Sequence, residues 1–256
     1  MKKSIFAAAV IAASFAVLGC NGKKTVTINS ASDLEGKKIG VQAGTTGEIY
    51  VEDVKDANVL SFKSGIDASL ALRNGAIDAI VLDELPAKEI VKRNTDLKIV
   101  EDKFVSEDYA IAVKKGNTEL LNSINETIKK IKSDGNYDAL VNFYIMKASD
   151  AKLPSAPEAE SNEVLKMGTN AAFPPFEYTE GSKVVGFDAT LAGFIANDYG
   201  KKLQIVDMAF DGLIAALQAD AIDFIAAGMT ATDERRSNVD FSEPYFTSNQ
   251  VIIVRK

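Results

Sequence analysis

The chain has 256 residues, of which 46% are hydrophobic, enough for two lobes or one large α/β domain. Its formal charge of −7 disfavours a nucleic-acid surface or a basic membrane patch. The absence of histidine excludes a His-based triad, a His metal ligand and a His general base. The single cysteine excludes an internal disulfide and a cluster of Cys ligands, and we expect no metal and no cofactor.

Residues 1–19 have the pattern of an export signal: a basic start, then an apolar segment too short to span a membrane comfortably. The sequence VLGC that ends at Cys20 resembles a bacterial lipobox, in which the cysteine is diacylated and becomes the first residue. The alternative is an ordinary signal peptide with an incidental cysteine. The small residue before Cys20 and the lack of any other cysteine favour lipidation. We therefore expect a tether at 20–30 and a lipid-anchored protein in the periplasm or at the cell surface.

Strands and helices alternate through the first half of the chain, which is typical of doubly wound α/β sheets. The patterns predict strands at 37–42, 58–62, 77–82, 97–100 and 109–113, and helices at 65–74, 84–93, 119–132 and 137–144. The sequence AGTTGE at 43–48 follows the first strand with small residues and Thr hydroxyls. This turn suits an anion, or it simply caps a helix.

Residues 147–163 interrupt the alternation with two prolines, several acids and few large apolar residues, which predicts a solvated linker. Beyond it the patterns predict strands at 164–168, 203–208, 221–226 and 251–254, helices at 187–199 and 212–217, and a rigid aromatic turn at 169–178. We therefore divide the exported chain into a lobe at 31–108, a hinge strand with helices packing on the other lobe at 109–146, the linker, and a second lobe at 164–256.

Arg235 occupies an unusual position for a cation. Thr232 is a predicted N-cap, and Asp233 and Glu234 form an acidic first helical turn. A guanidinium in this turn opposes the helix macrodipole, which suggests that an anion lies in front of it. Backbone N–H groups, a Thr hydroxyl and an Arg fork together suit a carboxylate. The alternative is a surface arginine paired with one of the two acids.

An internal repeat indicates two similar lobes. Ala71–Ile80 and Ala216–Ile225 are identical at six of ten positions, and each copy ends a helix, turns and enters a buried strand. The first strand ends at Asp83, and the second leads to Gly228 and Arg235. In open α/β sheets, ligands bind at the carboxyl ends of strands. Facing lobes would bring an acid and a base into one cleft, complementary to an α-amino acid. The alternative is a coincidental similarity between two α/β units.

Six segments carry a resemblance to a known family: GVQAGTTGE at 40–48, GTNAAFPPFEY at 168–178, VGFDATLA at 185–192, MAFDGLIAALQ at 208–218, AGMTATDERR at 227–236 and VDFSEPYF at 239–246. Together they resemble the polar amino-acid-binding proteins of bacterial ABC importers, solute-binding protein family 3. The resemblance covers nearly all of 31–148 and 164–256. It implies a two-lobed type II periplasmic-binding fold, with a doubly wound sheet in each lobe and the ligand cleft between them.

The order of the lobes departs from the family. In the family, the lobe with the aromatic turn comes first and the GTTGE lobe is inserted after it, whereas here the GTTGE lobe comes first. The chain therefore resembles a circular permutant. We expect Thr25–Ser30 to lie near Val251–Lys256, and the linker at 147–163 to span the family's original termini.

The resemblance also implies a set of ligand-binding residues. Arg235 grips the α-carboxylate, and Asp83 takes the α-ammonium. The hydroxyls of Thr230 and Thr46 assist the arginine, the carbonyl of Gly228 assists the aspartate, Phe173 and Phe210 sandwich the ligand side chain, and Asn170, Gln42 and Glu177 surround its far end. Two aromatic faces favour a flat cation. Without the motif, core packing is the ordinary explanation for both rings.

The expected function is that of a monomeric receptor, not an enzyme, that delivers an L-amino acid to an ABC permease. Arginine is favoured, with Glu177 as the acidic partner that relatives often supply at the position of Asn170. Lysine and histidine follow. Glutamine is the alternative, because Asn170 and Gln42 both donate and accept hydrogen bonds.

Two other classes of function are considered. A cyclohexadienyl-type dehydratase on the same fold needs a general acid, for which Glu177 is the candidate. A sensor ectodomain needs a transmembrane helix, and the sequence predicts none after residue 18.

Overall fold

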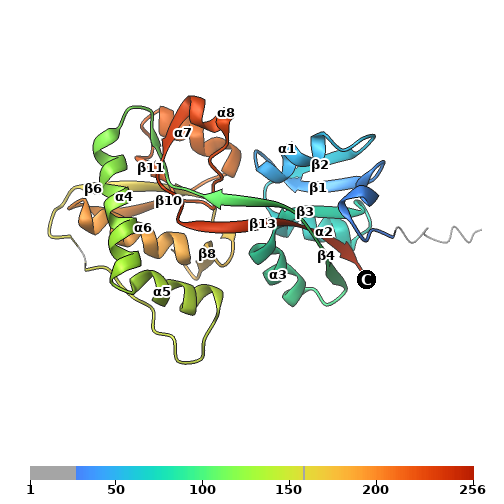
Figure 1. Cartoon of the computed structure of the whole chain (residues 1–256), viewed down its shortest axis with the longest axis horizontal. Helices are drawn as coiled ribbons and strands as arrows, with labels where there is room; N and C mark the ends of the chain where they lie inside the picture. The colour runs from blue at the N-terminus through green and yellow to red at the C-terminus, as the bar shows by residue number, and fades with distance from the viewer. Residues whose placement is uncertain (1–26, 158) are drawn as a thin grey trace, which may run out of the picture.

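The computed structural model describes residues 27–157 and 159–256 and shows two lobes, each built on a five-stranded sheet (Figure 1). The export signal expected at 1–19, the lipidation site Cys20 and the start of the tether lie outside the described residues. Within the described part, no helix has the length and apolarity that a membrane span requires.

The first lobe contains the sheet with strand order β2-β1-β3-β13-β4. Its strands are β1 (Lys38–Gln42), β2 (Asn58–Phe62), β3 (Ala79–Asp83), β4 (Leu97–Tyr109) and β13 (Phe246–Arg255), and its helices are η1 (Ala31–Leu34), α1 (Thr46–Glu52), α2 (Gly65–Arg73) and α3 (Glu84–Arg93). β1, β2 and β3 are parallel, whereas β13 runs antiparallel to both β3 and β4. The expected doubly wound sheet is present, with β13 and β4 added at one edge; of these two strands only β13 runs opposite to β1, β2 and β3.

The second lobe contains the sheet with strand order β10-β6-β11-β5-β12 and a small sheet β7-β8-β9. Its strands are β5 (Ala112–Lys114), β6 (Val164–Thr169), β7 (Ala172–Phe173), β8 (Glu177–Glu180), β9 (Lys183–Val185), β10 (Lys202–Asp207), β11 (Phe224–Ile225) and β12 (Val239–Phe241). Its helices are α4 (Thr118–Ser133), α5 (Asn136–Leu140) with a π-helical turn η2 (Val141–Ile145), α6 (Phe187–Asp198), η3 (Phe210–Gly212), α7 (Leu213–Gln218) and α8 (Asp233–Asn238). The described residues of the linker at 147–163 form no helix or strand.

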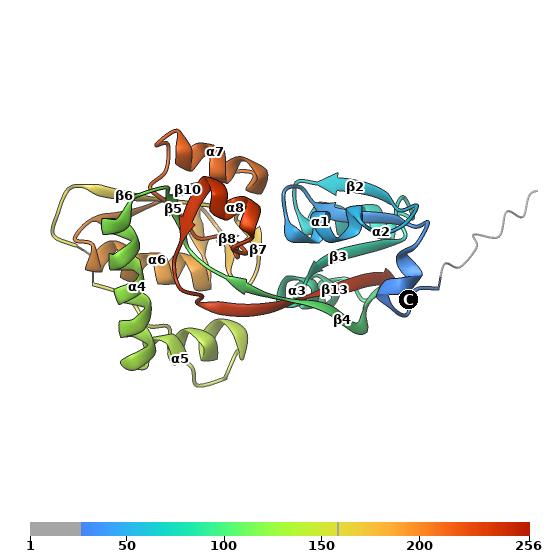
Figure 2. The same cartoon turned by 45° about the horizontal axis from the view of Figure 1, so that its top comes forward.

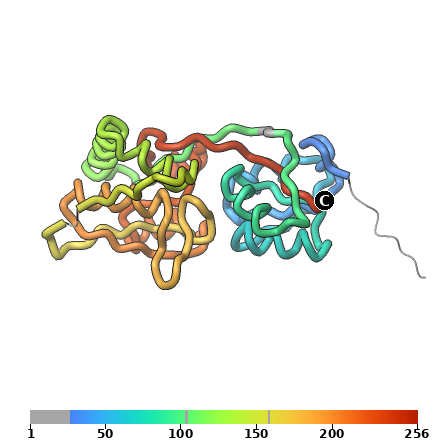
Figure 3. Tube along the Cα trace, turned by 90° about the horizontal axis from the view of Figure 1, so that it is seen from below, coloured from blue at the N-terminus to red at the C-terminus, as the bar shows by residue number. Residues whose placement is uncertain are grey.

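Two strands, β4 and β13, run between the lobes and lie side by side (Figures 2 and 3). We call them the hinge strands. They pair from Phe246 opposite Tyr109 to Arg255 opposite Leu97, with an irregularity between Gln250 and Ile252.

The hinge strands correct two predictions. The strand expected at 109–113 is divided, because β4 ends at Tyr109 and β5 begins in the other sheet at Ala112. The strand expected at 251–254 begins at Phe246, so the expected second lobe at 164–256 loses its last segment to the sheet of the first lobe. The added part contains four consecutive polar residues at 247–250, which hid the strand from a search for apolar runs.

The two copies of the internal repeat make the same contacts in the two lobes. A Cβ on Gly40 would lie 2.5 Å from the Ile77 side chain, and one on Gly168 would lie 2.2 Å from Ile222. Each isoleucine thus occupies the space above a glycine in the neighbouring strand. The aspartate that follows it accepts from a lysine N–H, Asp78 from Lys38 at 3.0 Å and Asp223 from Lys166 at 2.7 Å. The repeat is therefore one structural unit used twice, not a coincidence of composition.

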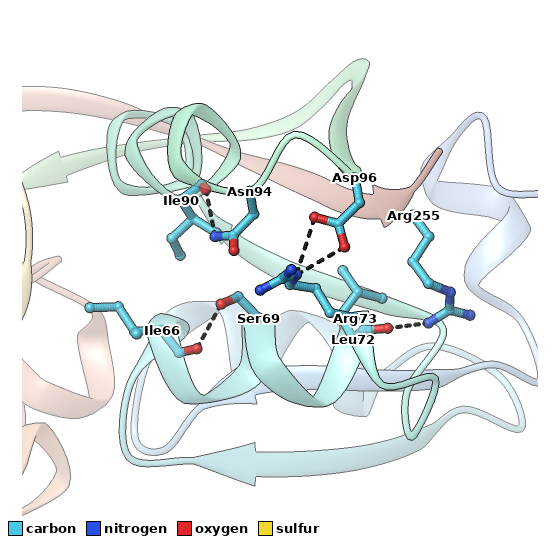
Figure 4. A network of polar contacts seen from close by, with 8 residues as sticks. All are labelled: Ile66, Ser69, Leu72, Arg73, Ile90, Asn94, Asp96 and Arg255. Carbon is cyan, nitrogen blue, oxygen red and sulfur yellow. Dashed lines mark hydrogen bonds and ion pairs between the residues drawn. The ribbon is translucent and has the colours of Figure 1, made fainter.

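The C-terminal strand is fixed to the first lobe by Arg255. Its guanidinium donates to the carbonyl oxygen of Leu72 at the end of α2 (Figure 4). It also donates to the carbonyl oxygen of Ile77 in the following turn. Ile28, near the other end of the described chain, belongs to the same buried cluster as Ile252 and Val254. The expected proximity of the two chain ends is therefore observed from residue 28 onward.

Candidate functional site

One cavity between the lobes brings together the residues that the sequence singled out. Its lining consists of Gln42, Thr45, Thr46 and Asp83 from the first lobe and Asn170, Phe173, Glu177, Phe210, Ala227, Gly228, Thr230 and Arg235 from the second. All ten predicted ligand-binding residues are in this set, and Thr45 and Ala227 were not predicted. The cavity has a volume of about 10 Å³, which is room for about one water molecule.

Arg235 is buried, with 7% of its surface exposed. Thr232 caps its helix by accepting the Arg235 N–H at 3.2 Å, as predicted. Its guanidinium donates from Nη1 to the carbonyl of Thr230 and from Nη2 to the carbonyl of Gly44, both at 2.8 Å. Among the described residues it forms no ion pair, so the alternative of a surface arginine paired with an acid is wrong. Because both direct acceptors of this buried guanidinium are neutral carbonyls, an anion can replace one of them as a stronger, charged partner.

Two hydrogen bonds join the lobes at the cavity. Gln42 donates from Nε2 to Oδ1 of Asn170 at 3.0 Å, and Asn170 donates to the carbonyl of Met208 at 2.8 Å. The Arg235–Gly44 contact also joins the lobes at this cavity. Both links use groups that are also placed to meet a ligand, so binding and lobe contact compete for the same hydrogen bonds.

Phe173 and Phe210 are both buried, but they have different neighbours. Phe173 stacks on Phe176 with 6.0 Å between ring centroids and belongs to the core of its lobe. The ring of Phe210 lies under the Arg235 guanidinium, 5.4 Å from its central carbon. Both rings therefore contribute to core packing, yet both line the cavity. The Phe210 contact shows that this ring accepts a planar cation on its face.

Asp83 ends β3 and is 6% exposed. Tyr109, at the end of a hinge strand, donates its hydroxyl to Oδ1 of Asp83. The pKa of Asp83 is raised from 3.8 to about 7, first by burial and then by the Glu107 carboxylate, against hydrogen bonds that favour the charge. Near neutral pH this carboxyl therefore changes charge readily, and a cation beside it favours the ionised form.

The hinge strands contribute polar residues that the sequence analysis missed. Glu107 is 4% exposed and accepts from Nε2 of Gln250 at 2.8 Å, and Ser248 is buried on the same strand as Gln250. Glu107 and Tyr109 are two apart in β4, as Ser248 and Gln250 are in β13, so each pair faces one side of the sheet. Polar residues two apart in the sequence were the signal that could have indicated these two strands.

Glu177 begins β8, lines the cavity and has no exposed surface. Burial raises the pKa of Glu177 well above its ordinary value, and the neighbouring Asp188 raises it further. Neither side-chain oxygen of Glu177 accepts from an N–H or O–H donor in the described structure. The residue thus presents a buried acidic group without a hydrogen-bond donor to the cavity.

The arrangement is suited to binding a zwitterion. A buried guanidinium on one lobe and a buried aspartate on the other face the same small space, with hydroxyl groups and two rings between them. In the part of the chain that the structure describes, no cluster of acidic, His or Cys side chains has the arrangement of a metal site.

Comparison with known proteins gives the class of the chain. Residues 165–256 match the model of the bacterial extracellular solute-binding proteins, family 3. The chain belongs to this family, and its two lobes joined by the hinge strands agree with the predicted type II periplasmic-binding fold, whereas the circular permutation stays a prediction.

Particular relatives share parts of the sequence. The arginine-binding extracellular protein ArtP of Bacillus subtilis is 46% identical over 92 residues, which is 36% of each chain. A probable histidine-binding protein of Campylobacter jejuni is 38% identical over 120 residues, 46% of this chain and 47% of the relative. The arginine-bound form of domain 1 from TmArgBP is 47% identical, covers 38% of this chain and 83% of that one, and gives a TM-score of 0.33. The chain spans between about a third and a half of these two curated relatives.

Proposed function

We propose that this protein is an extracytoplasmic receptor that binds an L-amino acid, arginine favoured, between its lobes and delivers it to an ABC permease. The observation that carries the proposal is that Arg235 from one lobe and Asp83 from the other line the same cavity. An α-amino acid is the common small molecule that carries both a carboxylate and an ammonium group. The names of the relatives, arginine- and histidine-binding proteins, support the same ligand class.

The head group of the ligand is held by charge-assisted contacts. Arg235 forms a two-pronged contact with the carboxylate, and the hydroxyls of Thr230 and Thr46 complete its hydrogen bonds. Asp83 and the carbonyl of Gly228 accept from the ammonium. The carboxylate replaces the carbonyl of Gly44 as an acceptor for Arg235, so binding exchanges a neutral partner for a charged one.

The side chain of the ligand lies between Phe173 and Phe210, with Gln42, Asn170 and Glu177 at its far end. Arginine fits this description because its guanidinium stacks on aromatic faces and carries a charge that Glu177 can meet. Opening of the lobes must precede binding, because the closed cavity has a volume of only about 10 Å³. The hinge strands are the elements about which such a motion occurs.

A thermal-shift panel of the proteinogenic L-amino acids on the mature, unlipidated protein tests the proposal. A ligand that binds only the folded state raises the melting temperature as its concentration increases. We expect the largest shift with arginine and a smaller one with lysine. If no amino acid raises the midpoint, the receptor function proposed here is incorrect.

Glutamine is a second candidate ligand, favoured by the direct contact between the two amides of Gln42 and Asn170. An amide side chain can replace either partner and keep all its hydrogen bonds. A shift confined to glutamine and asparagine in the same panel would support it.

A dehydratase activity is a further candidate, because Glu177 presents a protonated carboxyl group to a cavity lined by rings. General acid catalysis needs such a group. Incubation with prephenate or arogenate tests this activity, and the absence of an aromatic product would rule it out.

We also propose that the mature chain is anchored through a lipid on Cys20. A Cys20→Ala variant expressed in a bacterial host should move from the membrane fraction to the soluble fraction. Recovery of the wild-type protein without any lipid mass on Cys20 would contradict the proposal.

Finally, we propose that the gene order of the lobes is circularly permuted. The packing of Ile28 with Ile252 and Val254 supports this, because a direct connection there needs little extra chain. A variant that joins Lys256 to Thr27 through a short linker, so that Ile28 is kept, and opens the chain within 147–163 should fold and bind the same ligand. Both hinge strands stay intact in that variant, so we expect equal affinities. Loss of folding would show that the present order is required.

A further inference from the structure

Two carboxyl groups lie against each other behind the aromatic turn. Glu177 starts β8, and Asp188 is the second residue of α6; neither has any exposed surface. Glu177 lines the cavity between the lobes, and the Asp188 N–H donates to the carbonyl of Phe176, the residue before Glu177, at 2.9 Å, which holds the two carboxyl groups next to each other. In the described part of the chain, no lysine or arginine forms an ion pair with either one.

The hydrogen-bond donors around the two carboxyl groups indicate which of them carries the negative charge. Oδ2 of Asp188 accepts from the Gly228 N–H at 2.9 Å and from the Tyr245 hydroxyl at 2.7 Å. Both oxygens of Glu177 and Oδ1 of Asp188 have no donor in the described structure. Two buried carboxylates in contact repel strongly, so the pair retains a proton. Because two donors face Asp188, the charge resides there, and the proton resides on Glu177.

The surrounding groups maintain this state. Burial and Asp188 raise the pKa of Glu177, and the carboxylates of Asp83 and Asp207 raise it further. The pKa of Asp188 is raised to about 6 by burial, while its hydrogen bonds from Tyr245 and Gly228 oppose the rise. Arg235 lines the same cavity but donates to the carbonyls of Thr230 and Gly44. In the absence of ligand, Glu177 is therefore neutral at physiological pH.

We propose that Glu177 and Asp188 form a proton-sharing pair that reads the charge of the ligand side chain. A cationic side chain that reaches Glu177 stabilises its carboxylate, and the shared proton leaves to solvent. A neutral side chain instead accepts or donates a hydrogen bond at Glu177 and leaves the proton in place. The inference rests on the proposed function, since it assigns a charge-selecting step to the same cavity. Asp188 acts through Glu177 and is a positioning residue.

The number of protons released on binding should therefore differ between ligands of nearly equal shape. Arginine and citrulline differ at the end of the side chain, where one is cationic and the other neutral. Any amino acid with an α-ammonium favours ionisation of Asp83, so that release is common to both ligands. The release from Glu177 occurs with arginine alone. The difference between the two ligands therefore isolates the carboxyl pair from the rest of the site.

Isothermal titration calorimetry in buffers of different ionisation enthalpy measures the protons released on binding. We expect arginine to release about one proton more than citrulline or glutamine between about pH 6 and pH 8. In a Glu177→Gln variant this difference should vanish, whereas Glu180→Gln, an exposed change on the same strand, should retain it. Equal proton release by cationic and neutral ligands that both bind would overturn the inference. Failure of every amino acid to bind would instead contradict the proposed function.

An infrared measurement on the wild-type protein tests the inference without a variant. A protonated carboxyl group gives a C=O stretch distinct from that of a carboxylate. At about pH 8.5, where Asp83 with its pKa of about 7 is already ionised, we expect one such band that disappears when arginine is added and persists when citrulline is added. A spectrum without this band at neutral pH in the ligand-free protein would show that Glu177 carries no proton and would overturn the inference.

Discussion

Arg235 donates a hydrogen bond of 2.8 Å to the carbonyl of Gly44, although the two residues lie in different lobes and 191 positions apart. Gly44 has a φ of 75°, and a Cβ there would lie 3.0 Å from the Cα of Asp211 in the second lobe. The glycine therefore allows the two lobes to approach closely at the point where the guanidinium sits. A ligand carboxylate that accepts this hydrogen bond replaces the Gly44 carbonyl, and so replaces a contact that joins the two lobes.

Replacement of Arg235 by lysine should weaken amino-acid binding by about 100-fold or more. Lysine keeps the charge but loses the planar fork, and it leaves one buried carbonyl without a donor. Titration calorimetry with arginine measures the effect. Arg236→Lys is the matched control, because Arg236 is exposed on the same helix. Similar losses in both variants would show that the helix, not the fork, determines affinity.

Ligand affinity should increase with pH through the titration of Asp83. The ionised carboxylate holds the ligand ammonium, and the pKa of Asp83 is about 7 in the ligand-free protein. Below that pH, binding must first remove a proton, so affinity should fall by up to about tenfold per pH unit and level off above it.

A pH series on the Glu177→Gln background measures the Asp83 contribution alone. Adding Asp83→Asn should weaken binding and flatten the curve, whereas the exposed Asp53→Asn should leave it unchanged. A pH dependence that survives Asp83→Asn would assign the titration to another group.

The ring of Phe210 should matter more for cationic ligands than for neutral ones. Phe210→Leu keeps an apolar side chain but removes the face that meets a guanidinium, which should cost arginine affinity roughly threefold to thirtyfold. Competition binding with arginine and glutamine measures the selectivity. Phe241→Leu is the matched control, because the Phe241 ring lies 5.4 Å from Arg236 in the same geometry outside the cavity. Equal losses of affinity for arginine and glutamine would show that Phe210 contributes only by packing.

Gly186→Ala should destabilise the folded protein by several kcal/mol. Gly186 has a φ of 128°, and an added Cβ would lie 2.2 Å from the carbonyl oxygen of Phe176, which is backbone and cannot swing aside. Urea unfolding gives the free energy difference. Gly193→Ala in the following helix has no atom within 4 Å of the added Cβ and should be neutral or stabilising by roughly 0.5–1 kcal/mol. Comparable stabilities for the two variants would mean that the aromatic turn relaxes around Gly186.

Local sequence patterns were sufficient to predict most helices and strands and the residues that line the cavity. The helix predicted at 84–93 has those bounds in the structure, and the strand predicted at 58–62 does as well. Capping by Thr232 and the repeat that positions Asp83 and Arg235 also follow from short-range rules, because spacing and turn chemistry act within a few residues.

Tertiary structure decided what depends on contacts between distant segments. The polar residues of the hinge strands became buried only because β4 and β13 pair with each other, so their strand character was hidden in sequence. The proton on Glu177 follows from the contact with Asp188, and the unusual pKa of Asp83 follows from burial beside Glu107. Sequence thus determined which side chains carry the chemistry, whereas burial and charge–charge distance, which exist only in the folded chain, decided their protonation.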